Sequence, residues 1–206
     1  DAPEEVGGMN LPSTLIAAIN EELGRTVTPF VFPPDSPNLH MLLAKANENQ
    51  RAKYLRPYAD GEAKAAIAIS EPGAGGDPAG MTTRAVRESG SWIINGRKIW
   101  ISHAAHADFL IVMARVGEGK RHEGITAFIV ENGTPGLNIL REIPMLAGLR
   151  TFEIAFDDCR IPEEQLLGEI GAGFAPMQLR LVVRRLQIGA WCVGMSLRAL
   201  AMMIDH

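Results

Sequence analysis

Hydrophobic positions change their spacing twice along this chain. In residues 1–64 they recur at helical spacing, between residues 65 and 170 they form short runs of strand length, and from residue 171 the helical spacing returns. Glycine, proline, asparagine or aspartate separates most of the short runs, as in antiparallel β structures. We therefore predict a partial N-terminal helical domain at 1–64, a β-domain at 65–170 and part of a C-terminal helical domain at 171–206.

The first region contains two predicted helices. Ser13 is a suitable N-cap and Gly24 a suitable stop for a helix whose apolar stripe consists of Leu15, Ile16, Ile19 and Leu23. A proline-rich connection runs from Pro29 to Pro37. Asn47 is placed to cap a second helix, which we expect to end just before Pro57 because a proline disfavours helical backbone in the residue before it.

The β-domain is predicted from eight short runs. Their regular succession, with turns between them, indicates an antiparallel sandwich or barrel. Together with the flanking helices this predicts an α+β fold. The predicted strands are residues 65–70, 82–88, 91–95, 98–102, 108–116, 124–130, 136–141 and 151–158.

The last helix, from about Phe174 to Asp205, is apolar nearly all round. Its polar positions near the start are Gln178, Arg180, Arg184, Arg185 and Gln187. Such a helix must be covered on most sides, and no other part of the chain is left to cover it. We therefore expect a fragment of a larger helical domain. Arg198, Ser196 and two glycines interrupt the apolar run, so we predict a buried helix and no membrane span.

Composition limits the classes of function. The chain has 206 residues, 47% hydrophobic and 21% charged, which is ordinary for a soluble globular protein. A net charge of −4 provides no basic field for nucleic acid. Two cysteines, Cys159 and Cys192, are too few for a disulfide framework and indicate buried thiols in a reducing compartment. The N-terminus shows no signal-peptide pattern.

The most distinctive segment runs from Ala68 to Asp77, Ala-Ile-Ser-Glu-Pro-Gly-Ala-Gly-Gly-Asp. A short apolar run ends in the Ser70 hydroxyl, and three glycines follow. Glycines permit close approach of the backbone to a ligand, and exposed N–H groups bind anions or polar ring edges. Taken alone, the segment is equally compatible with a tight turn that binds nothing.

A second segment follows about twenty residues later. Asn95-Gly96 is the preferred pair for a two-residue hairpin turn, so we predict two strands joined there. Alternation along the second strand would place Trp100 and Ser102 on one face, where an indole and a hydroxyl could bind a flat polar heterocycle. Trp92, on the preceding strand, is expected in the core.

Together the two segments resemble the acyl-CoA dehydrogenase family. Residues 69–77 are similar to its flavin loop, (Ile/Val)-(Thr/Ser)-Glu-Pro-x-Ala-Gly-Ser-Asp, and residues 95–102 to its segment Asn-Gly-x-Lys-x-(Trp/Phe)-Ile-(Thr/Ser). The order and spacing of further matches extend the resemblance over nearly the whole chain. These matches are residues 3–8, 21–25, 50–61, 124–130 and 156–162.

The resemblance implies a bound FAD. Ile67, Ile69 and Ser70 would line the edge of the flavin ring, Trp100 would lie against it, and Ser102 would bond to it. Because about 150–250 Å² of indole is too much apolar surface to leave in water, we expect Trp100 to be covered; ordinary core packing is the alternative. Gly75 would approach the cofactor. Gly76 departs from the family, which usually has Ser or Thr there, and so offers the CoA arm only a backbone N–H.

The chain contains no recognisable catalytic base. In most members the base lies beyond the equivalent of His206, and a minority have a Glu where this sequence has Arg184. By the resemblance, the next residue, Arg185, would orient the active site or the substrate, with a solvated or interface arginine as the alternative. Glu71 is expected to be a structural carboxylate that accepts hydrogen bonds from loop N–H groups. His103 and His106 lack further ligands at metal spacing, so no metal site is predicted.

The resemblance implies FAD-dependent α,β-dehydrogenation of an acyl-CoA thioester, with electrons passed to an electron-transferring flavoprotein. It also implies a homo-oligomer, either dimer or tetramer, in a bacterial cytoplasm or a mitochondrial matrix. One alternative is an oxygen-reactive relative of the acyl-CoA oxidase or nitroalkane oxidase type. Another is a non-catalytic module that uses the same surface for binding or assembly.

Overall fold

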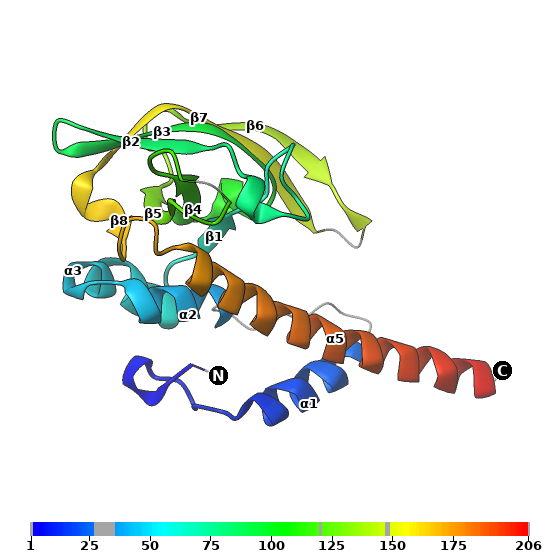
Figure 1. Ribbon diagram of the computed structural model, residues 1–206. Helices are drawn as coiled ribbons and strands as arrows, with labels where there is room; N and C mark the ends of the chain where they lie inside the picture. The colour runs from blue at the N-terminus through cyan, green and yellow to red at the C-terminus, as the bar shows by residue number, and fades with distance from the viewer. Residues whose placement is uncertain (1, 27–35, 120, 147–148, 206) are drawn as a thin grey trace.

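The computed structural model describes residues 2–26, 36–119, 121–146 and 149–205, and Figure 1 shows a layered β structure above a group of helices. The upper strands are β2 (Arg84–Glu88), β3 (Ser91–Ser102), β6 (Leu137–Pro144) and β7 (Arg150–Pro162). The lower strands are β1 (Ala65–Ala68), β4 (Phe109–Arg115), β5 (Ile125–Glu131) and β8 (Leu166–Leu167). The helices are α1 (Ser13–Gly24), α2 (Ser36–Lys45), α3 (Glu48–Gln50), α4 (Arg56–Ala59) and α5 (Phe174–Ile204).

The strands form a single mixed sheet in the order β6-β7-β3-β2-β4-β5-β8, with β1 paired to β4. Most neighbours are antiparallel, so the predicted α+β class is confirmed. Two pairs, β1 with β4 and β2 with β4, are parallel, which the sequence did not indicate. The short strand β8 was also not predicted.

Strand β4 separates two apolar cores because it is buried on both faces. Successive side chains of a strand point to opposite sides. Leu110, Val112 and Ala114 therefore pack upward with Trp92 and Phe128 between the two layers of strands. The alternate residues of β4 pack downward against the helices, in a cluster that includes Phe109, Ile111, Met113, Leu39, Leu42, Tyr54 and Leu55. An uninterrupted apolar run is typical of such a strand.

The predicted first helix is confirmed from Ser13 to Gly24, but the predicted Ser13 cap is wrong: Pro12 is the N-cap, and no side chain caps this end. The Asn47 cap is also confirmed: its side chain accepts from the Gln50 N–H, and the Gln50 side chain accepts from the Asn47 N–H. The predicted end before Pro57 is wrong. A π-helical turn over 51–55 leads into α4, which contains Pro57 in its first turn.

The proline-rich connection at 29–37 lies mostly outside the described residues. Its predicted end at Pro37 is wrong, because α2 begins at Ser36 and includes Pro37 in its first turn. Proline is well suited to that position because the first N–H groups of a helix have no partner within it.

The predicted hairpin turn at Asn95-Gly96 is wrong, because β3 is one continuous strand from Ser91 to Ser102. β2 and β3 pair directly, and the turn between them contains Ser89 and Gly90, both at positive φ. Asn95 instead opposes two residues of β7, and its side chain bonds to Asp158. Gly96 has φ +150° beside Thr83, and the Asn-Gly pair lies opposite a bulge in β7.

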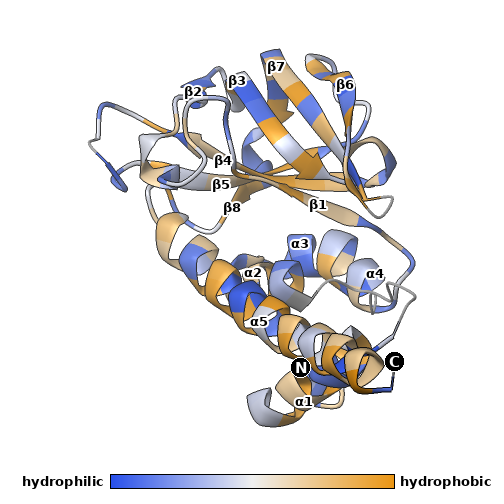
Figure 2. Ribbon diagram, turned by 90° about the vertical axis from the view of Figure 1, so that its right-hand side faces the viewer, coloured by the Kyte–Doolittle hydropathy of each residue, from blue (hydrophilic) through white to orange (hydrophobic). Residues whose placement is uncertain are grey.

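Helix α5 is confirmed over Phe174–Ile204, but the predicted burial is not found within the described chain. Only Met177 and Gly194 of its residues are buried, and many of its large apolar residues are exposed. Figure 2 shows the apolar positions along α5 in orange. By length and composition it is the one described helix that could cross a membrane. It nevertheless packs against α1, where the backbones approach closely: a Cβ on Gly24 would lie 2.2 Å from the Trp191 carbonyl oxygen.

Candidate functional site

The two segments singled out in the sequence lie side by side. The Ile99 N–H donates to the Ser70 carbonyl over 2.9 Å, and Lys98 Nζ donates to the Ile69 carbonyl over 3.0 Å. Both bonds join the end of the β1 segment to β3, thirty residues later in sequence. Ser70 is therefore attached one residue before Trp100 along β3.

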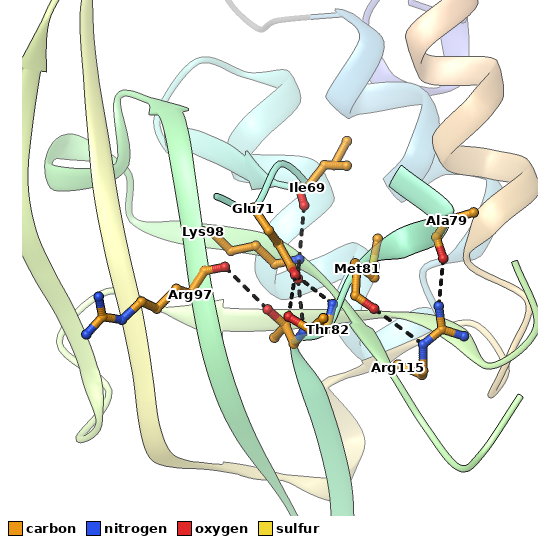
Figure 3. A network of polar contacts seen from close by, with 9 residues as sticks. Ile69, Glu71, Ala79, Met81, Thr82, Arg97, Lys98 and Arg115 are labelled. Atoms are coloured by element: carbon orange, nitrogen blue, oxygen red, sulfur yellow. Dashed lines mark hydrogen bonds and ion pairs between the residues drawn. The ribbon is translucent and has the colours of Figure 1, made fainter. Parts of the chain in front are cut away.

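A buried ion pair lies beneath this junction (Figure 3). Lys98 Nζ is 2.8 Å from Glu71 Oε1, and the two side chains are 0% and 3% exposed. Glu71 Oε1 also accepts from the Thr83 N–H over 3.0 Å. Its Oε2 accepts from the Thr82 N–H over 2.6 Å and from the Thr82 hydroxyl over 2.8 Å. The predicted structural role of Glu71 is confirmed, with threonine N–H groups and the Lys98 ammonium as its donors.

Both members of this pair are charged at neutral pH. Burial opposes ionisation of Glu71, but the neighbouring Lys98 ammonium and the hydrogen bonds from Lys98, Thr83 and Thr82 outweigh it and lower the pKa of Glu71 to about 2. Burial lowers the pKa of Lys98 to about 8, against the opposing effect of the Glu71 carboxylate. The carboxylate is therefore a weak proton acceptor that already accepts hydrogen bonds from Lys98, Thr82 and Thr83.

Trp100 occupies an unusual backbone position. Ile99 and Trp100 together oppose Glu153 of β7, so the strand bulges there, and Trp100 has φ +63°. Left-handed backbone at a bulky residue costs on the order of 1–3 kcal/mol and is concentrated at functional sites. Because the alternation rule applies to extended backbone, it does not fix the direction of Trp100. The Trp100 residue is 52% exposed, so within the described chain the expected cover is not found.

The glycine loop begins with a tight turn, in which Glu71 and Ala74 exchange backbone hydrogen bonds of 3.2 and 3.1 Å. Gly73, Gly75 and Gly76 are exposed, none has positive φ, and a Cβ added to any of them would meet nothing within 4 Å. At the end of the loop, the Asp77 carboxylate accepts from the Ala79 N–H over 3.0 Å. The glycines therefore leave free space beside the loop, which a ligand could enter.

The remaining predicted site residues are spread over three settings. Ile67 and Ser102 are half-buried, whereas Ile69 is buried with the lower core. Arg185 is exposed on α5. Trp92 is 2% exposed between the layers of strands, as predicted.

Arg115 was not identified from the sequence. This buried arginine at the end of β4 donates to five backbone carbonyls and has no ion pair among the described residues. Its bonds join the 79–81 turn to the 119–123 loop. The acceptors are the carbonyl oxygens of Ala79, Met81, Gly119, Arg121 and Glu123. The one available signal is a charged residue closing the apolar run Phe-Leu-Ile-Val-Met-Ala-Arg.

Two hollows in the described chain lie away from the two segments. One, of about 380 Å³, is bounded by α1, α2 and α5, and the other, of about 500 Å³, lies where α5 begins, near His40 and His122. Ser70 and Trp100 line neither. Among the residues that the structure describes, no three His, Cys, Asp or Glu side chains gather closely enough to hold a metal ion.

Two sequence models of one family match this chain. The N-terminal domain of acyl-CoA dehydrogenases matches residues 1–62, and their middle domain matches residues 66–159. The two matches together include well over half of the chain and contain both segments that form the site.

Individual relatives align over the whole chain. (R)-Benzylsuccinyl-CoA dehydrogenase of Thauera aromatica is 39% identical, over 100% of this chain and 52% of that protein. The mitochondrial short-chain specific acyl-CoA dehydrogenase of Homo sapiens is 32% identical, over 100% of this chain and 51% of that protein. The chain thus spans about half the length of the relatives it matches.

Solved structures share the fold. The structure of PigA with FAD and proline has a TM-score of 0.88 and 30% identity, over 99% of this chain and 55% of that chain. An acyl-CoA dehydrogenase from Geobacillus kaustophilus has a TM-score of 0.81 and 32% identity, over 92% of this chain and 52% of that chain.

Proposed function

Because the chain belongs to the acyl-CoA dehydrogenase family, we propose that it supplies the FAD-binding face of an enzyme that oxidises an acyl-CoA thioester between its α and β carbons. The observation that carries this proposal is the junction of Ser70 with β3, which brings both flavin-type segments of the sequence to one place. The 1–64, 65–170 and 171–206 division is part of the same proposal.

The residues at the junction fit a flavin ring. Trp100 leaves half of its surface exposed on a strained bulge, which is a costly way to hold an indole that binds nothing. Ser70 and Ser102 add hydroxyls that donate or accept hydrogen bonds at the edge of a polar ring. The glycine loop leaves room for a bulky ligand beside Gly75 and Gly76.

When bound, FAD would supply the hydride acceptor for the reaction. The task of the chain's own residues is to bind and orient: Trp100 covers a ring face, and Ser70, Ser102 and the edge of Ile67 position it. The Ile69 side chain is buried in the lower core. Ile69 therefore contributes by fixing the loop to β3, through the bond from Lys98 to its carbonyl. Gly76 and Arg185 face the substrate in this proposal.

Glu71 is not the base in this mechanism. A general base must reach the proton it removes and must have a pKa suited to accepting it. Glu71 is 4% exposed, its carboxylate already accepts four hydrogen bonds, and its pKa is about 2. It therefore holds the loop in place and exchanges no proton with substrate.

The proposal is tested on the purified protein. Near-stoichiometric flavin absorbance is expected, and in the enzyme whose FAD-binding face this chain forms, anaerobic addition of butyryl-CoA or (R)-benzylsuccinyl-CoA should bleach it, with only slow recovery in air. Slow recovery supports transfer to an electron-transferring flavoprotein. Rapid recovery of the absorbance in air would identify an oxygen-reactive relative. A protein that binds no flavin would leave the non-catalytic module as the remaining hypothesis. A homo-oligomer, and a cytoplasmic or mitochondrial location like those of the named bacterial and mitochondrial relatives, belong to the same proposal.

Replacing Trp100 with alanine should raise the Kd for FAD about 10- to 100-fold. Stacking on an aromatic side chain contributes roughly 1–3 kcal/mol, and each tenfold change in Kd corresponds to about 1.4 kcal/mol. Titration of apoprotein followed by flavin fluorescence measures the effect, and Trp100→Phe should lose less. Val86→Ala, which truncates a residue 60% exposed on β2, is the control. An unchanged Kd in Trp100→Ala would remove this residue from the site.

A further inference from the structure

We propose that Glu71 and Lys98 are positioning residues for the flavin site, which hold Ser70 and Trp100 in the arrangement that a ring binds. The inference rests on the proposed function. Neither side chain reaches the surface, so both act through the residues beside them. Glu71 directly follows Ser70, and Lys98 precedes the bulge that presents Trp100.

The pair joins three separate segments at one point. Lys98 ties β3 to the carbonyl of Ile69, while Glu71 binds Lys98 and the N–H groups of Thr82 and Thr83. Figure 3 shows the Lys98 ammonium between the Ile69 carbonyl and the Glu71 carboxylate, with Thr82 also bonded to Glu71. A displacement of any one segment would therefore break bonds to the other two.

A buried ion pair is not the most stabilising way to fill this space, because both charges lose their hydration. Two charges removed from water are often no more stabilising than apolar side chains of similar volume. What the pair adds is direction, because charge-assisted hydrogen bonds fix angles and distances that apolar contacts leave free. In this site the pair fixes the orientation of the backbone at Ile69 and Glu71, on either side of Ser70, and of β3 just before Trp100.

Arg115 anchors the other end of the same loop. Its guanidinium binds the carbonyls of Ala79 and Met81, beyond the glycines, whereas Lys98 binds the carbonyl of Ile69, before them. The open stretch containing Gly73, Gly75 and Gly76 is thus held between two buried cations. This arrangement gives a loop that is formed before any ligand arrives.

Glu71→Gln tests the inference. One amide oxygen cannot replace the two carboxylate oxygens, and the amide NH₂ would face the Thr82 N–H, a second donor. We expect the Kd for FAD to rise about 10-fold. At saturating FAD, the flavin fluorescence should also be less quenched than in wild type, because the indole of Trp100 is displaced. Glu71→Asp, which keeps the charge on a shorter side chain, should show a smaller change in both.

A matched control separates positioning from stability. Val130→Ala truncates a fully buried residue of β5 in the upper core, away from the loop. It should lower the melting temperature and leave both the Kd and the quenching within twofold of wild type. If Glu71→Gln, or Glu71→Asp where the first does not fold, behaves like this control, the pair is merely structural and the inference is wrong. A wild-type protein that binds no FAD would instead overturn the proposed function, and the inference with it.

Discussion

Replacing Lys98 with methionine is expected to lower the free energy of unfolding by about 3–5 kcal/mol. Methionine fills a similar volume, so the cost comes from charge rather than from a cavity. The Glu71 carboxylate would stay buried without its cation, still held by the N–H groups of Thr82 and Thr83. Urea denaturation followed by circular dichroism at neutral pH measures the difference.

The matched control for this change is Lys53→Met. Lys53 Nζ lies 2.6 Å from Glu131 Oε1, an even shorter ion pair, but the two side chains are 61% and 44% exposed. Exposed pairs of this kind typically contribute about 0–1 kcal/mol. Equal losses in the two variants would show that burial of the Lys98 pair carries no special cost.

Gly96→Ala should destabilise the protein by about 2–5 kcal/mol. A Cβ at this position would lie 2.5 Å from Thr83 Oγ1 and 2.7 Å from the Thr83 Cα, and the backbone has φ +150°. Overpacking a tight contact costs roughly 1–3 kcal/mol, and an unfavourable backbone region costs a similar amount. Because Thr83 donates to Glu71, the strain would also reach the loop that carries Ser70.

Gly90→Ala isolates the backbone part of that effect. Gly90 also has positive φ, +73°, but a Cβ there would meet nothing within 4 Å. Its substitution should cost only about 1 kcal/mol. Thermal unfolding of both variants provides the comparison. A Gly96→Ala protein as stable as Gly90→Ala would contradict the close packing of Thr83 against Gly96.

The sequence predicted those parts of the fold that local chemistry determines. Asn47 marks a helix start through its own hydrogen bonds and was placed correctly. Ser13 and Gly24 gave the extent of α1 but not its caps, which are Pro12 and Arg25. The uninterrupted run of β4 predicted a strand, but its pairing with β1 and β2 in parallel depends on contacts far along the chain. Asn95-Gly96 shows the limit most clearly, since the pair favours a turn in isolation, whereas here it continues β3 opposite a bulge in β7 and beside Thr83.

The sequence identified the residues that form the candidate site better than the residues that hold them in place. Ser70 and Trp100 follow from the sequence because their segments are distinctive, and the structure brings them together. The roles of Lys98 and Arg115 could not be read in advance, because a buried charge is recognised by its partners, and those partners are mostly backbone atoms without a sequence signal. Roles toward FAD and substrate, including those of Gly76 and Arg185, remain proposals.

Strand β3 has one further consequence. It carries Trp92 in the core, pairs with β2 and β7, and holds the Ser70 loop through Lys98 and Ile99. The conformational entropy of these residues is therefore lost when the β-domain folds, not when a ligand binds. Binding of a ring at Trp100 therefore does not have to order these residues, and the loss of conformational entropy that would weaken the affinity is avoided.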